Sequence, residues 1–342
     1  MSNIKAMNDS GSGIEARFRF LEPDEGGVLS EAIEAAYGDS YDVRWVYDGA
    51  EVSARLAAGT YVACVAESED GDLLCHEGMS LAAAGDAVGH SGQAVTMPAA
   101  RGQHLFTRTK RFLMDWAAGQ GLAGMYSEAT AAHPYSQRAN IELGAHETGF
   151  LLGWIPASVS NDAAAGSRRG RQSAALFYTK LNDGHDRPVY APERHRAIVE
   201  QTLRLCELRG TLAEVPAGVE LVERSELHVA IEADHNLALI TVRAPGADLE
   251  AAVAAERRHL FHHQGLDVIY LDLPLEQPAT ALVADHLEAL GVSYSGVFPN
   301  SHCDGDVLRM QSLHRARIKA DDVAVASEHG RELLEYVLAD LA

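Results

Sequence analysis

Hydrophobic and polar residues follow two different periods in the first half of the chain, and together they predict a sheet flanked by helices. Alternation with a period of two predicts strands over residues 17–21, 60–67, 73–81 and 93–97. Stripes with helical spacing predict one helix over 26–37 and another from Gly102 to about Ala118. The polar cluster at 68–72 predicts a hairpin turn between two of the strands.

The pattern continues with an apolar stretch over 122–129, which predicts a strand near the centre of the sheet. Pro134 begins a further helix, and Gly144 ends it. Strands are predicted over 149–155 and 173–181, and the polar loop between them, 158–171, is long enough to be mobile. A segment rich in glycine, proline and charge then predicts a linker at 183–191.

The second half of the chain repeats part of this pattern. The stretch GQGLAGMYSEA, which begins at Gly119, matches HQGLDVIYLDL, which begins at His263. Each stretch follows a predicted helix and precedes one begun by proline, and those later helices end in IELGA and EALGV. We infer an internal duplication. The predicted divisions are a disordered tail at 1–13, a first domain at 14–182, the linker, and a second domain at 192–342.

Charge and cysteine content limit the kinds of binding partner and the cellular compartment that are expected. The net charge is −21, whereas nucleic acids and anionic membranes need a net basic face, so neither is expected as a partner. No apolar run approaches the length of a membrane span, and the tail lacks the apolar core of a signal peptide. The cysteines form no CxxC pair, so buried, reduced thiols in a cytoplasmic protein are expected. They are Cys64, Cys75, Cys206 and Cys303.

Against this acidic background, the stretch TMPAARGQHLFTRTKR at 96–111 gathers bases where a strand gives way to a helix. Backbone N–H groups at a helix N-terminus have no internal partners, and the helix dipole makes that end positive. Gly102 would let an anion approach these amides, and four bases add positive charge: Arg101, Arg108, Lys110 and Arg111. An ordinary turn with solvated bases would have the same letters, so both interpretations stand. Neither a Walker loop nor a dinucleotide fingerprint is present.

The order of the predicted elements gives this turn a context, because it resembles that of the GCN5-related N-acetyltransferase (GNAT) superfamily. The resemblance is carried by Val95, Pro98, Arg101 and Gly102 in VTMPAARG, and by Leu143-Gly144 in ELGA. A YG-x-x-Y loop at 37–41 and a T-x-x-H-x-x-SQ segment at 130–137 are similar to those of one bacterial GNAT group. The resemblance covers about residues 15–182, and the second half looks like the C-terminal part of the same fold.

The resemblance implies an α/β (α+β) acyl-CoA N-acyltransferase fold, in which helices flank a mixed, mostly antiparallel sheet, here in tandem. It implies an N-acetyltransferase that needs no metal and transfers an acetyl group from acetyl-CoA to an amine of a small molecule or a protein. The diphosphate would lie on the turn amides, and the thioester would lie where strands 93–97 and 122–129 splay apart. The implied CoA-binding residues are Thr96, Met97, Pro98, Arg101, Gly102, Gln103, His104, Leu105, Phe106, His133 and Ser136.

Two positions of the turn depart from the superfamily pattern. Ala99 replaces the usual glutamine or arginine, and His104 replaces a glycine or alanine, so its side chain could crowd the diphosphate or donate to it.

The acid and base of the reaction are left open by the sequence. Counting back from Gly144, the positions of the usual asparagine and the usual tyrosine acid hold His133 and Asn140. Tyr135 or Tyr126 could replace that acid. Glu128 and His133 are candidate bases, although Glu128 could instead be a strand-end carboxylate in a hydrogen-bond network. His76 and Glu77 face opposite sides of one strand and are weaker candidates.

Four aromatic residues follow the first helix and are candidates for acceptor binding: Tyr37, Tyr41, Trp45 and Tyr47. They suit a polar or cationic acceptor, and they could equally pack an irregular loop. The pair His259 and His263 has the spacing of shared metal ligands, but HExxH and a third ligand are absent, so a solvated helix face is expected.

The second copy predicts that the chain has a single CoA site. Pro245, Gly246 and Asp248 stand where the first copy has its arginine, glycine and histidine. Asp248 predicts a helix N-cap whose carboxylate would occupy the amides and repel a diphosphate. The alternative to an enzyme is a non-catalytic CoA-binding regulatory or interaction protein, and a third possibility is an acyltransferase of protein lysines or N-termini. The oligomeric state is left open.

Overall fold

The computed structural model describes residues 15–41, 43–83, 86–157, 170–302, 305–339 and 341. The chain divides into two compact units, Met1–Ser127 and Glu128–Ala342. The predicted tail, residues 158–169 of the predicted polar loop, and Cys303 lie outside the described residues. The other three cysteines are buried and free, as predicted.

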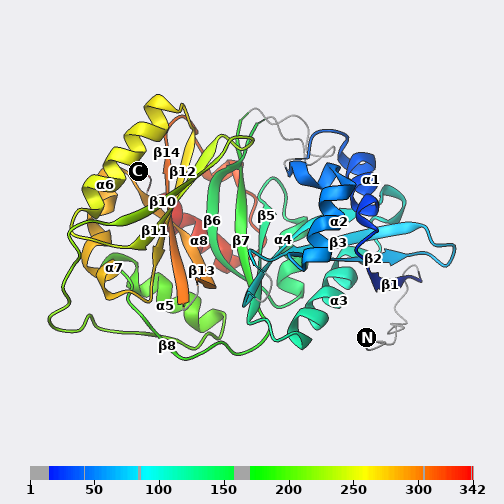
Figure 1. Ribbon diagram of the computed structural model, residues 1–342, viewed down its shortest axis with the longest axis horizontal. Helices are drawn as coiled ribbons and strands as arrows, with labels where there is room; N and C mark the ends of the chain where they lie inside the picture. Colours follow the sequence, from blue (N-terminus) through cyan, green and yellow to red (C-terminus); the bar gives the residue numbers. More distant parts are fainter. Residues whose placement is uncertain are drawn as a thin grey trace. The chain divides into compact units, whose positions relative to one another are not determined.

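The first unit is a sheet with three helices (Figure 1). Its strands are β1 (Arg17–Phe20), β2 (Tyr61–Glu67), β3 (Leu73–Ser80), β4 (Val88–Thr96) and β5 (Gly124–Thr130), whose last three residues begin the second unit. The helices are α1 (Gly26–Tyr37), α2 (Gly49–Ala58) and α3 (Leu105–Gly119), with short 3-10 turns η1 (Arg44–Tyr47) and η2 (Pro98–Ala100). Strands β1 to β5 lie in chain order, antiparallel except for the parallel pair β4–β5.

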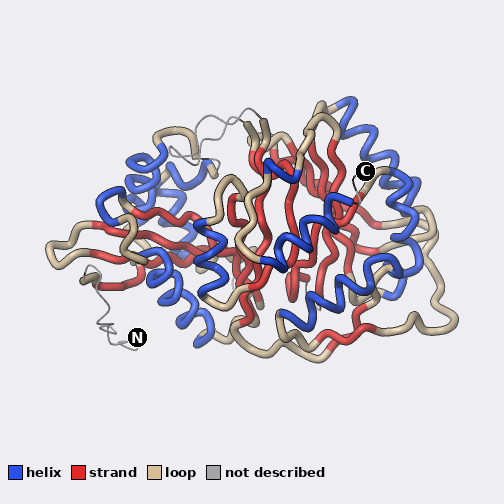
Figure 2. The backbone as a smooth tube through the Cα atoms, turned by 180° about the vertical axis from the view of Figure 1, so that it is seen from behind, coloured by secondary structure: helices blue, strands red, loops and turns tan. Residues whose placement is uncertain are grey.

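Alternate side chains of β2 point into different layers. Tyr61, Ala63 and Val65 pack with the buried side chains of α1 and α2. On the other face, the Cys64 thiol donates to the carbonyl of Thr109 in α3 at 3.5 Å. Because successive strand residues face opposite sides, α1 and α2 cover one face of the sheet and α3 covers the other. Figure 2 shows the same elements from behind.

Helix α2 is not predicted by the hydrophobic pattern, because Val52 is its only buried residue. Its ends are set by local chemistry instead. The Asp48 carboxylate accepts hydrogen bonds from the amides of Ala50 and Glu51 at 2.9 and 3.3 Å. Gly59 ends the helix with a φ of +69°. The capping residues were therefore the available signal in the sequence.

The second unit is a larger sheet with helices on its faces. Its strands, in spatial order, are β7 (Gln172–Lys180), β6 (His146–Ile155), β13 (Ser293–His302), β14 (Gly305–Leu313), β12 (Val268–Pro274), β11 (Leu237–Ala244) and β10 (Glu226–Glu232). A separate parallel pair is formed by β8 (Arg187–Val189) and β9 (Gly210–Leu212). The helices are α4 (Tyr135–Glu142), α5 (Arg196–Leu205), α6 (Leu249–Arg258) with its π-helical extension η4 (His259–His263), α7 (Pro278–Val283) and α8 (Glu328–Ala339). Three 3-10 turns complete it: η3 (Glu193–His195), η5 (Ala284–Leu290) and η6 (Ala320–Asp322).

Two glycines join the hairpins of this sheet. Gly149 of β6 pairs with Gly296 of β13. A Cβ added to Gly149 would lie 2.4 Å from the carbonyl oxygen of Ser295 and 2.5 Å from the Cα of Gly296. The Ser295 hydroxyl also donates to the carbonyl of Phe150 at 2.9 Å. The close approach of the two backbones therefore requires glycine on both strands.

The predicted linker at 183–191 contains strand β8. The guanidinium of Arg187 in this strand is buried and donates to both carboxylate oxygens of Asp306 in β14, at 2.5 and 3.0 Å. The segment is thus anchored to the sheet of the second unit. The boundary between the compact units falls at Ser127–Glu128, inside the predicted first domain, and the proposed domain limits stay a prediction.

The main sheet of each unit contains a parallel strand pair joined by a helix: β4–α3–β5 in the first, β11–α6–β12 in the second. The matching sequence stretches at Gly119 and His263 lie at the same helix-to-strand step of the two connections. Antiparallel pairs predominate elsewhere. The predicted fold class, a mixed and mostly antiparallel sheet flanked by helices, is confirmed.

Candidate functional site

The turn between β4 and α3 presents a row of backbone N–H groups. The amides of residues 102–106 have no hydrogen-bond partner among the described residues. Gly102 and His104 both adopt left-handed conformations, with φ of +77° and +55°. Gly102 is exposed, and a Cβ there would meet nothing within 4 Å. Free amides at the start of a helix attract an anion, so the turn is accessible and chemically suited to one.

The four basic side chains near this turn lie in different environments. Arg101 and Arg111 are exposed. The guanidinium of Arg108 lies over the ring of Phe18, 5.1 Å from its centre. Lys110 turns inward and is only 2% exposed, so its ammonium belongs to the core and not to the turn.

Directly before the turn, β4 and β5 pair only briefly. Residues Val88–His90 of β4 pair with Gly124–Tyr126 of β5, and 91–96 have no β5 partner among the described residues. The pairing of β4 with β3 is irregular at the same level, between His76 and Gly78, and Gln93 has a φ of +54°. A β-bulge bends its strand. The two strands therefore splay apart from Ser91 onward, at the place that the sequence predicts for a thioester.

Strand β3 holds this bulge from both faces. The Nδ1 atom of buried His76 lies 2.9 Å from the carbonyl oxygen of Gln93. Burial lowers the pKa of His76 to about 4, so the ring is neutral at pH 7 and Nδ1 donates the proton of this bond. On the other face, the hydroxyl of Ser91 donates to Glu77 Oε1 at 2.6 Å.

Glu77 and Lys110 are two buried charges behind the splay. Burial raises the pKa of Glu77 to about 7, against the opposing effects of the Lys110 charge and the Ser91 hydrogen bond. Burial lowers the pKa of Lys110, and the Glu77 charge opposes that shift. The Lys110 ammonium lies 3.4 Å from the hydroxyl of Ser127 in β5. The sequence did not identify this pair because its members are in different elements.

The acid and base candidates from Glu128 onward belong to the second unit. Glu128 is half-buried and, by strand alternation, faces the same side of β5 as Tyr126. The rings of His133 and Tyr135 lie 4.8 Å apart, and Tyr135 is 68% exposed. The hydroxyl of Ser136 is buried without a hydrogen-bond partner in the described part of the chain.

Asn140, at the position of the superfamily's tyrosine acid, is 2% exposed inside α4. A carboxamide does not ionise at neutral pH, so Asn140 cannot itself act as a general acid.

The predicted aromatic residues of the acceptor loop separate into two groups. Tyr37 donates to the carbonyl of Ala94 beside the β4 bulge at 3.3 Å, and its ring lies 5.1 Å from that of Tyr41. Trp45 instead packs edge-on against Tyr61 at 5.0 Å. The Tyr47 hydroxyl is bonded within the loop itself, to backbone groups of Gly38 and Tyr41.

Sequence reasoning missed one aromatic pair at the splay. His90 and Tyr126 belong to the last paired positions of β4 and β5, and their rings stack 4.6 Å apart with an interplanar angle of 4°. The only sequence signal was that Tyr126 and Glu128 share a face of one strand.

The corresponding turn of the second unit is closed by its own chain. The amide of Gly246 donates to the Ser225 hydroxyl at 2.9 Å, and the amide of Ala247 donates to the Val222 carbonyl at 2.8 Å. Asp248 stands at the N-cap of α6, but its carboxylate accepts from the amide of Ser225 at 2.6 Å and not from its own helix. The predicted capping of α6 by this side chain is therefore wrong, although the turn is occupied.

The parallel strands β11 and β12 of the second unit do not splay apart. Residues Leu237–Thr241 of β11 pair continuously with Val268–Asp272 of β12, and this pairing has no register shift. The splay found between β4 and β5 is therefore not repeated there.

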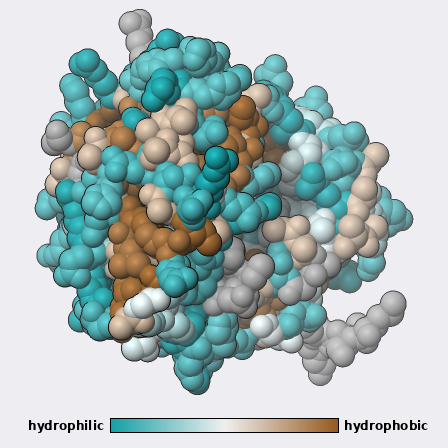
Figure 3. Space-filling model, turned by 60° about the vertical axis from the view of Figure 1, so that its left-hand side comes forward, coloured by the Kyte–Doolittle hydropathy of each residue, from teal (hydrophilic) through white to brown (hydrophobic). Residues whose placement is uncertain are grey.

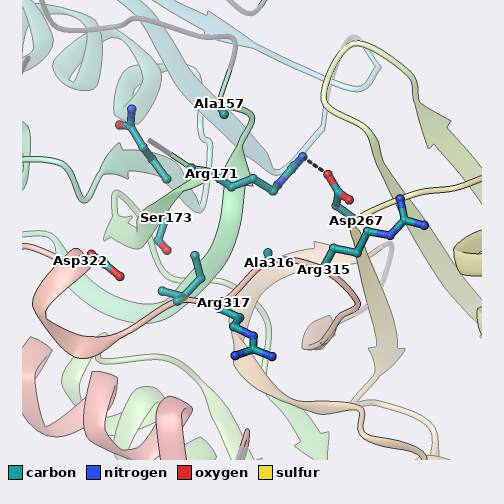
Figure 4. A pocket seen from close by; sticks show the side chains of 11 residues that line it. Ala157, Arg171, Ser173, Asp267, Arg315, Ala316, Arg317 and Asp322 are labelled. Carbon is teal, nitrogen blue, oxygen red and sulfur yellow. Dashed lines mark hydrogen bonds and ion pairs between the residues drawn. The ribbon is translucent and has the colours of Figure 1, made fainter. Parts of the chain in front are cut away.

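A cavity of about 270 Å³ lies in the second unit (Figure 4). Arg171 reaches across it to Asp267 at 3.5 Å and also donates to the carbonyls of Gly153 and His235. Figure 4 shows that the Arg315 and Arg317 guanidinium groups point away from one another. No predicted site residue lines this cavity.

No group of three or more potential metal-ligating side chains is found among the described residues. His259 and His263 lie with ring centres 5.7 Å apart on either side of the buried Phe261. In the described part of the chain, no helix is long and apolar enough to cross a membrane. Figure 3 shows apolar areas within a largely hydrophilic face, and the exposed large apolar side chains of the second unit include Val222, Ile231 and Leu282.

Comparison with protein-family models and with curated proteins gives no match. Among solved structures, the chain is similar to a GNAT superfamily phosphinothricin acetyltransferase of Sinorhizobium meliloti in complex with acetyl-CoA, with a TM-score of 0.40, 18% identity, and coverage of 49% of this chain and 90% of that one. It is similar to a putative acetyltransferase of Salmonella typhimurium with acetyl-CoA, with a TM-score of 0.39, 18% identity, and coverage of 52% and 98%. It is also similar to a ribosomal-protein-S5-alanine acetyltransferase of Vibrio fischeri, with a TM-score of 0.39, 12% identity, and coverage of 51% and 98%.

These likenesses each span about half of the chain, so any activity must be argued from the geometry of its own residues. That geometry contains the expected order of strands and helices, a parallel pair that splays, and an open turn after V-x-x-P.

Proposed function

We propose that this chain is an acyl-CoA-dependent N-acyltransferase, with acetyl-CoA as the donor and an amine of a small molecule or a protein as the acceptor. The observation that supports the proposal is that two features occur side by side along the chain of the first unit, an open turn and a splayed strand. Amides without partners at 102–106 suit a diphosphate, and the splay directly before them exposes the backbone of β4 to a pantetheine arm. The chemistry requires no metal.

In the proposed reaction, the amine nitrogen attacks the thioester carbonyl carbon, a C–N bond forms, and the C–S bond breaks. CoA leaves as a thiolate, which takes up one proton, and the ammonium formed on the acceptor loses one. Tyr37 and Tyr41 lie beside the β4 bulge and suit the approach of a cationic or polar amine. The catalytic contribution is mainly orientation of the two reactants and polarisation of the carbonyl.

Glu128 is the proposed base for the acceptor proton, acting directly or through water, and His133 is the second candidate. Tyr126, held by its stack on His90, and Tyr135 are the candidate donors to the leaving thiolate. Each role predicts a loss of kcat on substitution by an isosteric or truncated residue.

The first test is protection by CoA against thermal unfolding. We expect the melting temperature of the wild-type chain to rise with CoA, because a ligand at one hundred times its Kd adds about 2.7 kcal/mol to the free energy of unfolding. Gly102→Glu should lose this protection, since its carboxylate would face the diphosphate.

Gly71→Glu is the matched control. Gly71 has a φ of +86° and open space around its Cα, so the substitution brings similar backbone strain and the same charge in the β2–β3 hairpin. Retained protection in this control and lost protection in Gly102→Glu would support the site. Equal protection in both variants would refute it.

A non-catalytic CoA-binding role is the second candidate, and buried Asn140 at the position of the usual acid favours it. Steady-state thiol release from acetyl-CoA with a panel of amines separates the two. Release that depends on an amine and falls with Glu128→Gln supports the enzyme. CoA binding without any amine-dependent release would favour the binding protein.

A further inference from the structure

Glu77 and Lys110 occupy an environment in which ionisable groups are costly. Their exposures are 1% and 2%, and each is surrounded by sheet β2–β5 and helix α3. A carboxylate and an ammonium without water are retained only where they interact with each other and with hydrogen-bond partners. Glu77 Oε2 has no hydrogen-bond partner among the described residues, and the positive charge of Lys110 opposes the effect of burial on this carboxyl.

The two side chains contact both strands of the splay at the same level. Glu77 Oε1 accepts a hydrogen bond from the hydroxyl of Ser91 in β4 at 2.6 Å. Lys110 lies 3.4 Å from the hydroxyl of Ser127 in β5. His90 and Tyr126 form the last registered pair of these strands, and the two serines are the residues that directly follow it. The Glu77–Ser91 and Lys110–Ser127 contacts therefore lie where β4 and β5 begin to separate.

We propose that Glu77 and Lys110 are positioning residues that fix the opening between β4 and β5, and thereby the place of the thioester carbonyl. The pair forms a brace, defined here as Glu77, Ser91, Lys110 and Ser127. This inference rests on the proposed function for its catalytic consequence. Its structural consequence, a fixed opening between the strands, stands without bound CoA.

The brace also links the opening to the diphosphate turn. Lys110 lies in α3, the helix whose first amides face the proposed diphosphate. The first part of α3 is stiff over so short a distance. The contact of Lys110 with Ser127 in β5 therefore fixes the position of the turn relative to the opening between β4 and β5. Glu77 secures β4 from the other neighbouring strand, β3. Neither residue touches the reacting atoms, so an effect on catalysis would act through strand position.

The test uses Glu77→Gln, Lys110→Met and the double variant. Glu77→Gln keeps the shape and the acceptor for Ser91 but removes the charge. Lys110→Met keeps an unbranched apolar stem but releases Ser127. Each single change leaves one buried charge without the opposite charge, whereas the double variant removes both charges, so it should recover much of the stability lost by the single variants.

We expect the double variant to fold but to lose the fixed opening. Amide hydrogen exchange without ligand should be faster at 91–96 and 124–128 than in the wild type. With acetyl-CoA and an amine, kcat should fall about 10- to 100-fold through misplacement of the carbonyl. The KM for acetyl-CoA should stay near the wild-type value, because the turn amides are unchanged, and longer acyl donors should be accepted relatively better.

Val337→Ala is the control for a general loss of stability, since Val337 is fully buried in α8 (Glu328–Ala339) and belongs to the core of the second unit. It should lower the melting temperature without changing exchange at 91–96 or kcat. A double variant with wild-type exchange and kcat would overturn the proposal. If no variant or wild-type chain turns over acetyl-CoA, the proposed function fails, whereas the exchange measurement still decides whether the brace exists.

Discussion

At the scale of single residues, the first unit contains ionisable side chains whose pKa values are shifted mainly by burial. Glu77 and His76 are neighbours in β3, and they face opposite layers. Burial raises the pKa of the first to about 7 and lowers the pKa of the second to about 4. Both shifts favour the neutral form near pH 7, and each has a pH dependence that can be measured.

Glu77 should make the chain less stable as the pH rises from 4.5 to 7. Its pKa in the folded state lies above the ordinary value of 4.5, so the folded state keeps a proton that the unfolded state releases in this window. The free energy of unfolding then falls with pH, by at most about 1.4 kcal/mol per pH unit for one proton. Urea unfolding across this range should show a smaller fall in Glu77→Gln.

Glu31→Gln serves as the control for that measurement, because Glu31 is exposed on α1. Its stability should follow the wild-type curve across the window. Parallel curves for wild type and Glu77→Gln would show that the Glu77 carboxyl is not buried as described.

At the scale of elements, the backbones of β6 and β13 approach each other closely at Gly149 and Gly296. Gly149→Ala should lower the free energy of unfolding by about 1 to 3 kcal/mol, because its Cβ would collide with backbone atoms that cannot rotate away. Chemical denaturation measures the change.

Gly27→Ala is the opposite case and serves as its comparison. Gly27 lies within α1, and a Cβ there would meet nothing within 4 Å. Alanine should be neutral or raise the stability by up to about 1 kcal/mol. Equal destabilisation by both substitutions would mean that the contact of β6 with β13 is not the cause.

Elements also show where local patterns suffice and where they do not. The boundaries of α1 agree with the predicted 26–37 because its apolar stripe packs into the core, with Leu29 and Ile33 fully buried and Ala36 partly buried. The hydrophobic pattern does not predict helix α2 or strand β8, since α2 buries only one residue and β8 is only three residues long. Asp48 and the buried Arg187–Asp306 pair define those elements through hydrogen bonds, which hydrophobic periodicity does not register.

At the scale of the whole chain, we expect one CoA per molecule. The first-unit turn is open, whereas amides 246 and 247 of the second are bonded to Ser225 and Val222. Isothermal titration with CoA should give a stoichiometry of one for the wild type and no binding for Gly102→Glu. Two equivalents per chain, or binding retained in that variant, would contradict this expectation.

The sequence by itself determined the order of elements, the repeated helix-to-strand step and the position of the glycine turn. These features depend on residues close together in the chain, whose periodicity and conformational preferences act locally. The acidic composition and the V-x-x-P-x-x-R-G letters limited the candidate site to one short segment.

Only the tertiary structure decided which distant side chains lie together around that segment. It buried Lys110 beside Ser127, bonded Ser91 to Glu77, stacked His90 on Tyr126, and bonded Ser225 to the second turn. Glu77 and Ser91 are 14 residues apart in the sequence, and His90 and Tyr126 are 36 residues apart. Burial and pairing of such distant groups are properties of the packed sheet, so no local pattern could have specified them.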